Sequence, residues 1–182
     1  MFIPFDPMKV AQAAAALMRM EVLHRMSRLR LLKLLYIADR ELLQERSRPL
    51  TGDCPIAMDN GPVLRGTYSL IKGADFHSTQ WEKFFRNEGR DVHLINDPGV
   101  GKLSQQEIQK LHAISTRLSE WDDWAIAEYT HGFAEWIKNR PAKGSSNPIS
   151  IDDLLEATGL ADRKEQLLAN ERAETSMEQI LA

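Results

Sequence analysis

The sequence predicts a mainly α protein, a compact helical domain around a central apolar helix, with a minor two-stranded β element. Three observations predict this fold class. Apolar residues recur with helical spacing through 27–44, capping residues mark several further helices, and only the short segments 56–58 and 92–95 have the composition of strands. We expect the two-stranded element to join these two segments.

Length and composition indicate a single domain at residues 1–160 and a helical tail at 161–182. The chain has 182 residues, 43% of them hydrophobic, which is enough for a substantial core. A net charge of −3 argues against general electrostatic binding to nucleic acid. The single cysteine, Cys54, excludes an internal disulfide and fits a reducing compartment. No apolar run approaches the roughly 20 residues of a membrane span, so we expect a cytoplasmic protein without membrane contact.

The first half of the chain contains three predicted helices separated by a turn-rich loop. Asp6 can cap the first helix, with Pro7 at its first position, and Gly73 can end the third. Several prolines and glycines between 49 and 62 interrupt helical continuation. The predicted helices cover 6–23, 27–44 and 63–71.

The second half contains further short helices with their own caps. Ser104 and Glu107 have the Ser-x-x-Glu spacing of a capping box, and Ser150 can cap a helix after the 143–148 break. A turn at 87–90 precedes the predicted strand 92–95. The predicted helices cover 79–86, 104–118, 121–129 and 151–157, with another from Asp162 towards the end and a loop or helical turn at 131–137.

A polar stripe interrupts the apolar surface of the central helix. Lys33, Tyr36 and Arg40 follow one another at i, i+3 and i+7, and Asp39 lies on the flank of the stripe. Burying such groups without partners costs several kcal/mol. The stripe therefore either meets Asp and tyrosine partners inside the fold, which is the commoner arrangement, or faces a groove open to water or a ligand.

Patterns of metal, nucleotide and nucleophile chemistry are absent from the sequence. The five histidines form no metal-binding spacing, and no phosphate-binding glycine motif occurs, so we expect no metal and no cofactor. A pairing of Cys54 with His131 has no activating feature in the sequence. A small hydrolase centred on Asp39, Asp53 and His131 is the least favoured alternative, and we expect no enzyme.

Aromatic residues gather in the sequence between 121 and 136. Trp121, Trp124, Tyr129 and Trp136 are closely spaced. Most aromatic residues at such spacing belong to a core, but tryptophan is also enriched where proteins bind one another. An exposed pair would therefore mark a partner surface.

Motifs in a fixed order resemble the Panacea domain, also called the SocA-like antitoxin domain. The resemblance covers about 25–160. It is carried by KLLYIADR at 33–40, PLTGD at 49–53, Ala57, NGPV at 60–63, Tyr68, LSQQEIQKL at 103–111, His131, Trp136 and NPISIDDLL at 147–155.

The resemblance implies an antitoxin of a toxin–antitoxin pair. Members are mainly helical and neutralise a toxin encoded by a neighbouring gene through direct protein binding. Because members accompany very different toxins, the resemblance does not identify the toxin. The expected partner is a cognate protein toxin, a homo-oligomer is possible, and nucleic acid is not expected. The alternative is a phage- or mobile-element-associated adaptor or regulatory interaction protein.

Two groups of residues are candidates for a site. The first group would contact the partner, through the polar stripe, the 49–63 loop and an aromatic patch. The second group contains signature residues that hold the scaffold. The partner-binding candidates are Lys33, Tyr36, Arg40, Asp53, Asn60, Tyr68 and Trp136, and the structural residues are Asp39, Pro49, Gly61, Pro62 and His131.

Overall fold

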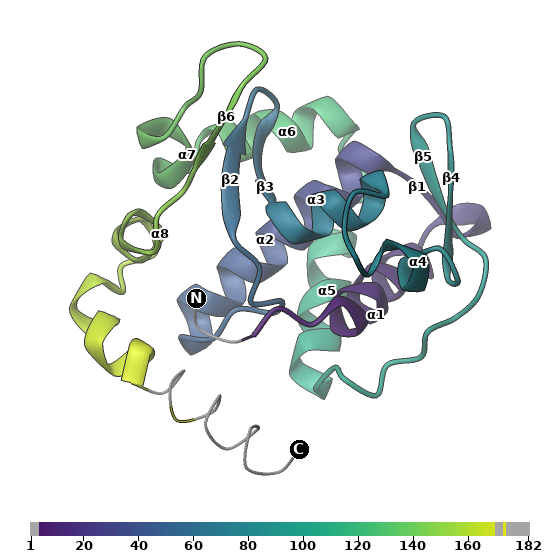
Figure 1. The fold of residues 1–182 in the computed structure, drawn as a ribbon, viewed down its shortest axis with the longest axis horizontal. Coiled ribbons are helices and arrows are strands. Elements are labelled where there is room, and N and C mark those ends of the chain that lie inside the picture. Colours follow the sequence, from purple (N-terminus) through teal and green to yellow (C-terminus); the bar gives the residue numbers. More distant parts are fainter. Residues whose placement is uncertain (1–3, 170–172, 174–182) are drawn as a thin grey trace.

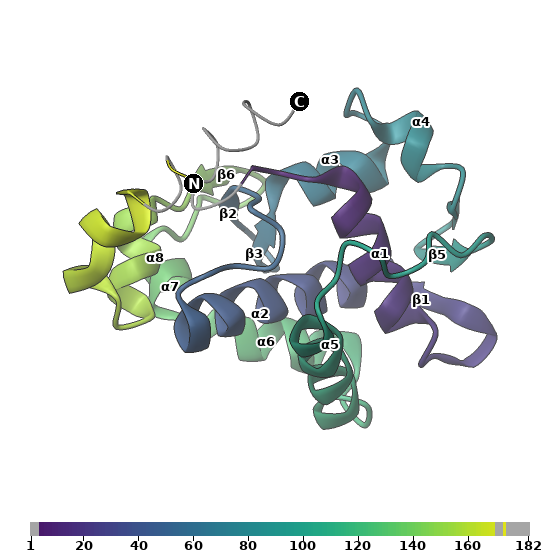
Figure 2. The ribbon, with the colours of Figure 1, turned by 90° about the horizontal axis from the view of Figure 1, so that it is seen from below.

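One long helix, α2 (Arg28–Arg46), forms the centre of the molecule. The computed structural model describes residues 4–169 and 173. In Figure 2, α2 crosses the middle, with α5 and α6 on one side and α1, α3 and the β2–β3 hairpin on the other. Ser27 caps its start by accepting a hydrogen bond from Arg30 N, and Ser47 ends it in the left-handed conformation. The predicted central apolar helix is confirmed.

Shorter helices pack around α2. The capping box of Ser104 and Glu107 starts α5 as the sequence predicts, and Asp6 caps α1. The surrounding helices are α1 (Pro7–Met18), α3 (Arg65–Lys72), α4 (Ser78–Trp81), α5 (Gln105–Arg117), α6 (Asp123–His131), α7 (Ala134–Lys138) and α8 (Ile151–Ala157), with 3₁₀ turns at Val22–His24 and Ala161–Arg163.

Two three-stranded antiparallel sheets replace the single two-stranded element that the sequence predicts. One sheet has the order β1 (Arg25–Ser27), β5 (Asp91–Leu94), β4 (Phe85–Glu88), and the other has the order β3 (Gly61–Leu64), β2 (Pro55–Met58), β6 (Ser146–Pro148). The sheets lie towards opposite ends of the molecule (Figure 1). The predicted pairing of 56–58 with 92–95 is therefore wrong, because each segment finds nearer partners in its own hairpin.

Several predicted boundaries also differ from the structure. The predicted helix 79–86 is a single turn followed by strand β4, and the start of the predicted helix 63–71 belongs to strand β3. The 131–137 segment, predicted as a loop or helical turn, contains the end of α6 and all but the last residue of the short helix α7. Most of the predicted 161–182 tail lies outside the described residues, but Leu167 is buried beside Leu160. The described residues contain no helix that is long and apolar enough to cross a membrane.

The buried apolar residues form two clusters. The larger joins α1, α2 and α5 to both sheets, and the smaller joins the end of α2 to α7 and α8. The alanine-rich face of α1 is fully buried, so the helix packs closely against its neighbours. Trp136 and Leu155 belong to the smaller cluster. That cluster holds the C-terminal part of the domain against α2.

The turn between β2 and β3 approaches helix α6 closely. Met58 pairs with Gly61, which leaves Asp59 and Asn60 as the turn, and Gly61 has a φ of +93°. A Cβ at Gly61 would lie 2.4 Å from Thr130 Oγ1 and 2.9 Å from Lys33 Nζ. Only glycine therefore fits this position, for both conformational and steric reasons.

Replacing Gly61 by alanine should destabilise the protein by about 2–4 kcal/mol, because the methyl group clashes with buried atoms and the backbone is strained. Gly89→Ala is the matched control, since Gly89 also has a positive φ, +60°, but has no atom within 4 Å of its Cβ position. The control should cost about 1 kcal/mol. Urea unfolding of both variants measures the difference, and equal losses would show that the close packing is unimportant.

Candidate functional site

The polar stripe of α2 turns inward. Lys33 is 0% exposed and Tyr36 is 2% exposed, while Arg40 is largely covered. The sequence left open whether these side chains face the core or a groove. The structure places them inside the fold, where each has a polar partner.

Glu135 is the partner of two stripe residues. Its Oε1 accepts a hydrogen bond from Arg40 Nε at 2.7 Å and another from Tyr36 Oη at 3.0 Å. The Arg40 guanidinium also lies 4.4 Å from the centre of the Phe133 ring. We expected aspartate partners for Arg40, and that expectation was wrong. Sequence reasoning missed Glu135, although it directly precedes the signature residue Trp136.

Asp39 holds the loop that follows α2. Its Oδ1 accepts hydrogen bonds from Thr51 N and Thr51 Oγ1, both at 2.7 Å. Burial raises the pKa of Asp39 to about 7, and the hydrogen bonds from Thr51 oppose that rise. Asp39 is therefore a structural residue that orders the 49–53 segment, and Pro49 beside it is buried.

Asp53 caps helix α3 from outside the helix. Its two carboxylate oxygens accept hydrogen bonds from Gly66 N at 2.8 Å and Thr67 N at 2.7 Å, and Cys54 N donates to it as well. The start of α3 has no cap from its own preceding residue, Leu64. Asp53 thus satisfies two free amides of the first turn and does not pair with Arg40 or Lys33.

Lys33 lies beneath the β2–β3 turn. Its ammonium nitrogen donates a hydrogen bond to Pro62 O at 2.7 Å, and no carboxylate of the described residues is within salt-bridge distance. Burial lowers the pKa of Lys33 to about 7. Lys33 is therefore a buried amine whose charge is only weakly compensated, directly under the tip of the hairpin.

Trp136 fastens the same hairpin from α7. Its indole Nε1 donates a hydrogen bond to Met58 O at 2.9 Å, and its ring stacks on His131 at 4.2 Å between ring centres. His131 Nδ1 contacts Glu128 at 3.0 Å. Trp136 is buried, so its role in the structure is to position the hairpin.

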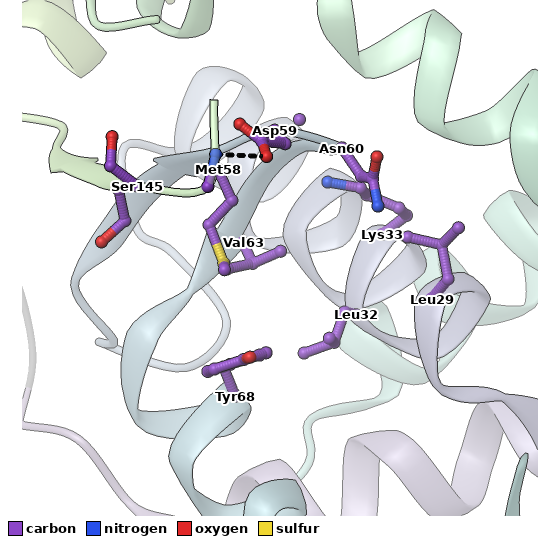
Figure 3. Close-up of a pocket in the computed structure, with 12 residues that line it drawn as sticks. Leu29, Leu32, Lys33, Met58, Asp59, Asn60, Val63, Tyr68 and Ser145 are labelled. Carbon is purple, nitrogen blue, oxygen red and sulfur yellow. Dashed lines mark hydrogen bonds between the residues drawn. The ribbon is translucent and has the colours of Figure 1, made fainter. Parts of the chain in front are cut away.

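The turn of this hairpin borders a hollow on the outer surface. The hollow has a volume of about 390 Å³, and Asn60 and Tyr68 line it together with Leu29, Leu32, Met58 and Val63. Figure 3 shows Leu29 and Leu32 on one wall, Tyr68 at the base and Ser145 on the opposite side. Gly144 N donates to Asp59 Oδ2 at 2.7 Å and holds the 142–146 loop against the turn.

Two further hollows adjoin the first. One, of about 450 Å³, extends towards Arg90 and Trp124, and the other, of about 340 Å³, extends towards Arg140 and Lys143. Asn60 lines all three hollows. We call this continuous region, centred on the Asp59–Asn60 turn, the hairpin surface.

The hairpin surface contains some of the predicted site residues and excludes others. Asn60 and Tyr68 line it, while Lys33, Gly61 and Trp136 lie at its floor or edge. The other candidates are inside the scaffold: Tyr36, Arg40, Asp39, Asp53, Pro49 and Pro62.

Trp124 is the exposed aromatic residue of the surface. Its side chain is 64% exposed at the start of α6 and lines the 450 Å³ hollow. The sequence placed Trp124 in an aromatic cluster but could not separate it from the buried Trp136. Exposure depends on helix orientation, which the local spacing of aromatic residues does not determine.

Asp39 and Asp53 line one small hollow that His131 does not line. Among the described residues, no group of three or more His, Cys, Asp or Glu side chains could hold a metal ion. Asp39 and Asp53 line a small hollow of about 80 Å³ with Cys54, but their oxygens accept hydrogen bonds from neighbouring amides and hydroxyls. His131 contacts Glu128 on a different part of the surface.

Replacing Glu135 by glutamine should destabilise the fold by about 2–4 kcal/mol, because the buried Arg40 loses its counter-charge. Glu128→Gln is the matched control: the Glu128 side chain is 80% exposed, so its loss should cost less than about 1 kcal/mol. Chemical unfolding of both variants measures the costs. Similar small costs would contradict the importance of the Glu135 contacts.

Replacing Lys33 by methionine should stabilise the protein in a pH-dependent way. Between pH 7 and 10.5 the unfolded chain binds a proton at Lys33 that the folded chain lacks, so wild-type stability rises with pH in this window. The variant should therefore exceed the wild type by roughly 2–5 kcal/mol at pH 6 and by much less at pH 10. Urea unfolding at both pH values measures the gain, and a gain independent of pH would contradict this explanation.

The sequence of this chain matches one known protein family over its central part. The profile described as "Antitoxin SocA-like, Panacea domain" matches residues 31–137, more than half of the sequence. This segment contains most of α2, the β2–β3 hairpin and Glu135. No curated protein and no solved structure matches the chain. The chain belongs to the SocA-like antitoxin family with the Panacea domain.

Proposed function

We propose that this protein is the antitoxin of a toxin–antitoxin pair and neutralises a toxin encoded by a neighbouring gene through direct binding at the hairpin surface. Family membership supports the antitoxin role, and the structure contributes the candidate surface. The main support for binding at this surface is that Asn60 lines three adjoining hollows, and that the exposed Trp124 lines one of them. Exposed aromatic residues beside apolar hollows are typical binding hot spots.

Hydrogen bonds within the fold hold the β2–β3 hairpin in place, which supports a role for its turn in binding. Lys33, Trp136 and Asp59 each fix the hairpin or its neighbouring loop through a hydrogen bond of 2.7–2.9 Å. A turn held from three directions loses little conformational freedom when a partner binds it. We propose that the protein acts by occluding the toxin and not by catalysis.

The same surface would also serve an adaptor or regulatory protein associated with a phage or mobile element. The two functions differ in the consequence of binding: an antitoxin abolishes the growth defect caused by its partner, while an adaptor binds a partner that is harmless alone. Co-expression separates these outcomes. The cytoplasmic location and the absence of enzymatic activity stay predictions.

The first experiment expresses each adjacent gene alone and together with this chain. We expect one adjacent product to stop growth when alone, and we expect this chain to restore growth and to co-purify with that product. Absence of a toxic neighbour, or toxicity that persists without complex formation, would reject the antitoxin proposal. A stable complex with a harmless neighbour would support the adaptor instead.

The second experiment tests the surface. Trp124→Ala should weaken toxin binding about 30-fold or more, since an exposed tryptophan that becomes a binding hot spot contributes about 2 kcal/mol or more at an interface. Phe76→Ala is the control, because Phe76 is 93% exposed on the connection between α3 and α4. Calorimetric titration measures both affinities, and circular dichroism verifies folding. Equal affinities would place the interface elsewhere.

A further inference from the structure

Cationic side chains surround the hairpin surface on two sides. Arg28 and Arg90 line the hollow beside Trp124, and Arg140 and Lys143 line the hollow on the other side of Asn60. The helix α6, the β2–β3 turn, the α7–β6 connection and the β4–β5 turn lie in the upper part of Figure 1, along one edge of the molecule. The cations therefore form the rim of one continuous surface.

These rim cations lack acidic partners within the described chain. Arg28 donates to the carbonyl oxygen of Gly89, and the Arg140 guanidinium lies 5.3 Å from the centre of the Trp136 ring, but none of the four forms an ion pair with a described residue. Basic residues elsewhere are often paired. For example, Lys110 contacts Glu41 and Glu45.

Two carboxylates, those of Asp59 and Asp123, line the hollows of the hairpin surface. Asp59 accepts a hydrogen bond from Gly144 N, and Asp123 occupies the first turn of α6, where the helix dipole favours a negative charge. They therefore offset the rim only partly. The buried Lys33 lies under the same turn and adds a further cation when protonated.

The four rim side chains are positively charged, whereas the whole chain has a negative net charge. The net charge is −3, so an acidic partner is repelled by most of the molecule and attracted where the cations gather. Such local complementarity orients a partner and speeds its association. Between the cations, Leu29, Leu32 and Trp124 offer apolar contact.

We infer that the partner binds the hairpin surface through an acidic segment whose carboxylates pair with the rim cations and whose apolar side chain enters the hollow between them. This inference rests on the proposed function and adds the chemistry of the partner segment. A protein is favoured over nucleic acid because Asp59 and Asp123 lie within the surface, where they would repel a continuous row of phosphates.

Charge reversal at the two sides of the rim tests the inference. Arg90→Glu and Lys143→Glu should each weaken binding of the neighbour-encoded toxin about tenfold at low salt, mainly through slower association. Lys83→Glu is the matched control, because it makes the same charge change at an exposed site before β4 and should alter affinity less than about twofold. Surface plasmon resonance over a range of salt concentrations gives the rates.

The outcomes separate this inference from the proposed function. If the toxin is neutralised but neither reversal nor salt changes its association more than Lys83→Glu does, the acidic-segment inference is wrong and the antitoxin function stands. If the wild type neutralises no neighbour, the function itself fails. Binding to a short random-sequence DNA duplex that weakens with the same two reversals, in place of toxin binding, would overturn the inference in favour of nucleic acid.

Discussion

The buried carboxylate of Glu135 is the contact on which the outer surface of this protein depends. It receives Arg40 and Tyr36 from the central helix and so fixes the short helix α7, which has only five residues and could not be stable alone. The next residue, Trp136, then reaches Met58 O and holds the hairpin. A charge pair inside the fold thereby sets the position of a turn on the surface.

The hairpin is fixed from below as well as from the side. Lys33 reaches Pro62 O, and the absence of a side chain at Gly61 lets the turn approach Thr130 and Lys33. Burial disfavours the charged form of the Lys33 amine, so burying this side chain lowers stability at neutral pH, while its hydrogen bond to Pro62 O defines the geometry of the turn. The polar stripe therefore contributes specificity of arrangement more than stability.

The sequence predicted features that depend on neighbouring residues and missed those that depend on distant ones. Periodicity and caps identified α2 and the capping box of α5, because these signals lie within one or two helical turns. The pairing of β2 with β6 joins segments about ninety residues apart, and Glu135 is 95 residues from Arg40. Spacing along the chain contains no information on such contacts. For the same reason, the sequence did not distinguish the buried Trp136 from the exposed Trp124.

The side chains that hold this fold together differ from those that set the charge of its surface. The signature residues of the resemblance, such as Asp39, Asp53 and Gly61, make contacts within the fold. By contrast, Arg140 and Lys143 lie beyond the matched segment 31–137 and project from the α7–β6 connection. A change at these exposed positions alters the surface charge without disturbing Glu135 or Lys33. Surface charge and fold stability can therefore vary separately in this protein, because different side chains determine them.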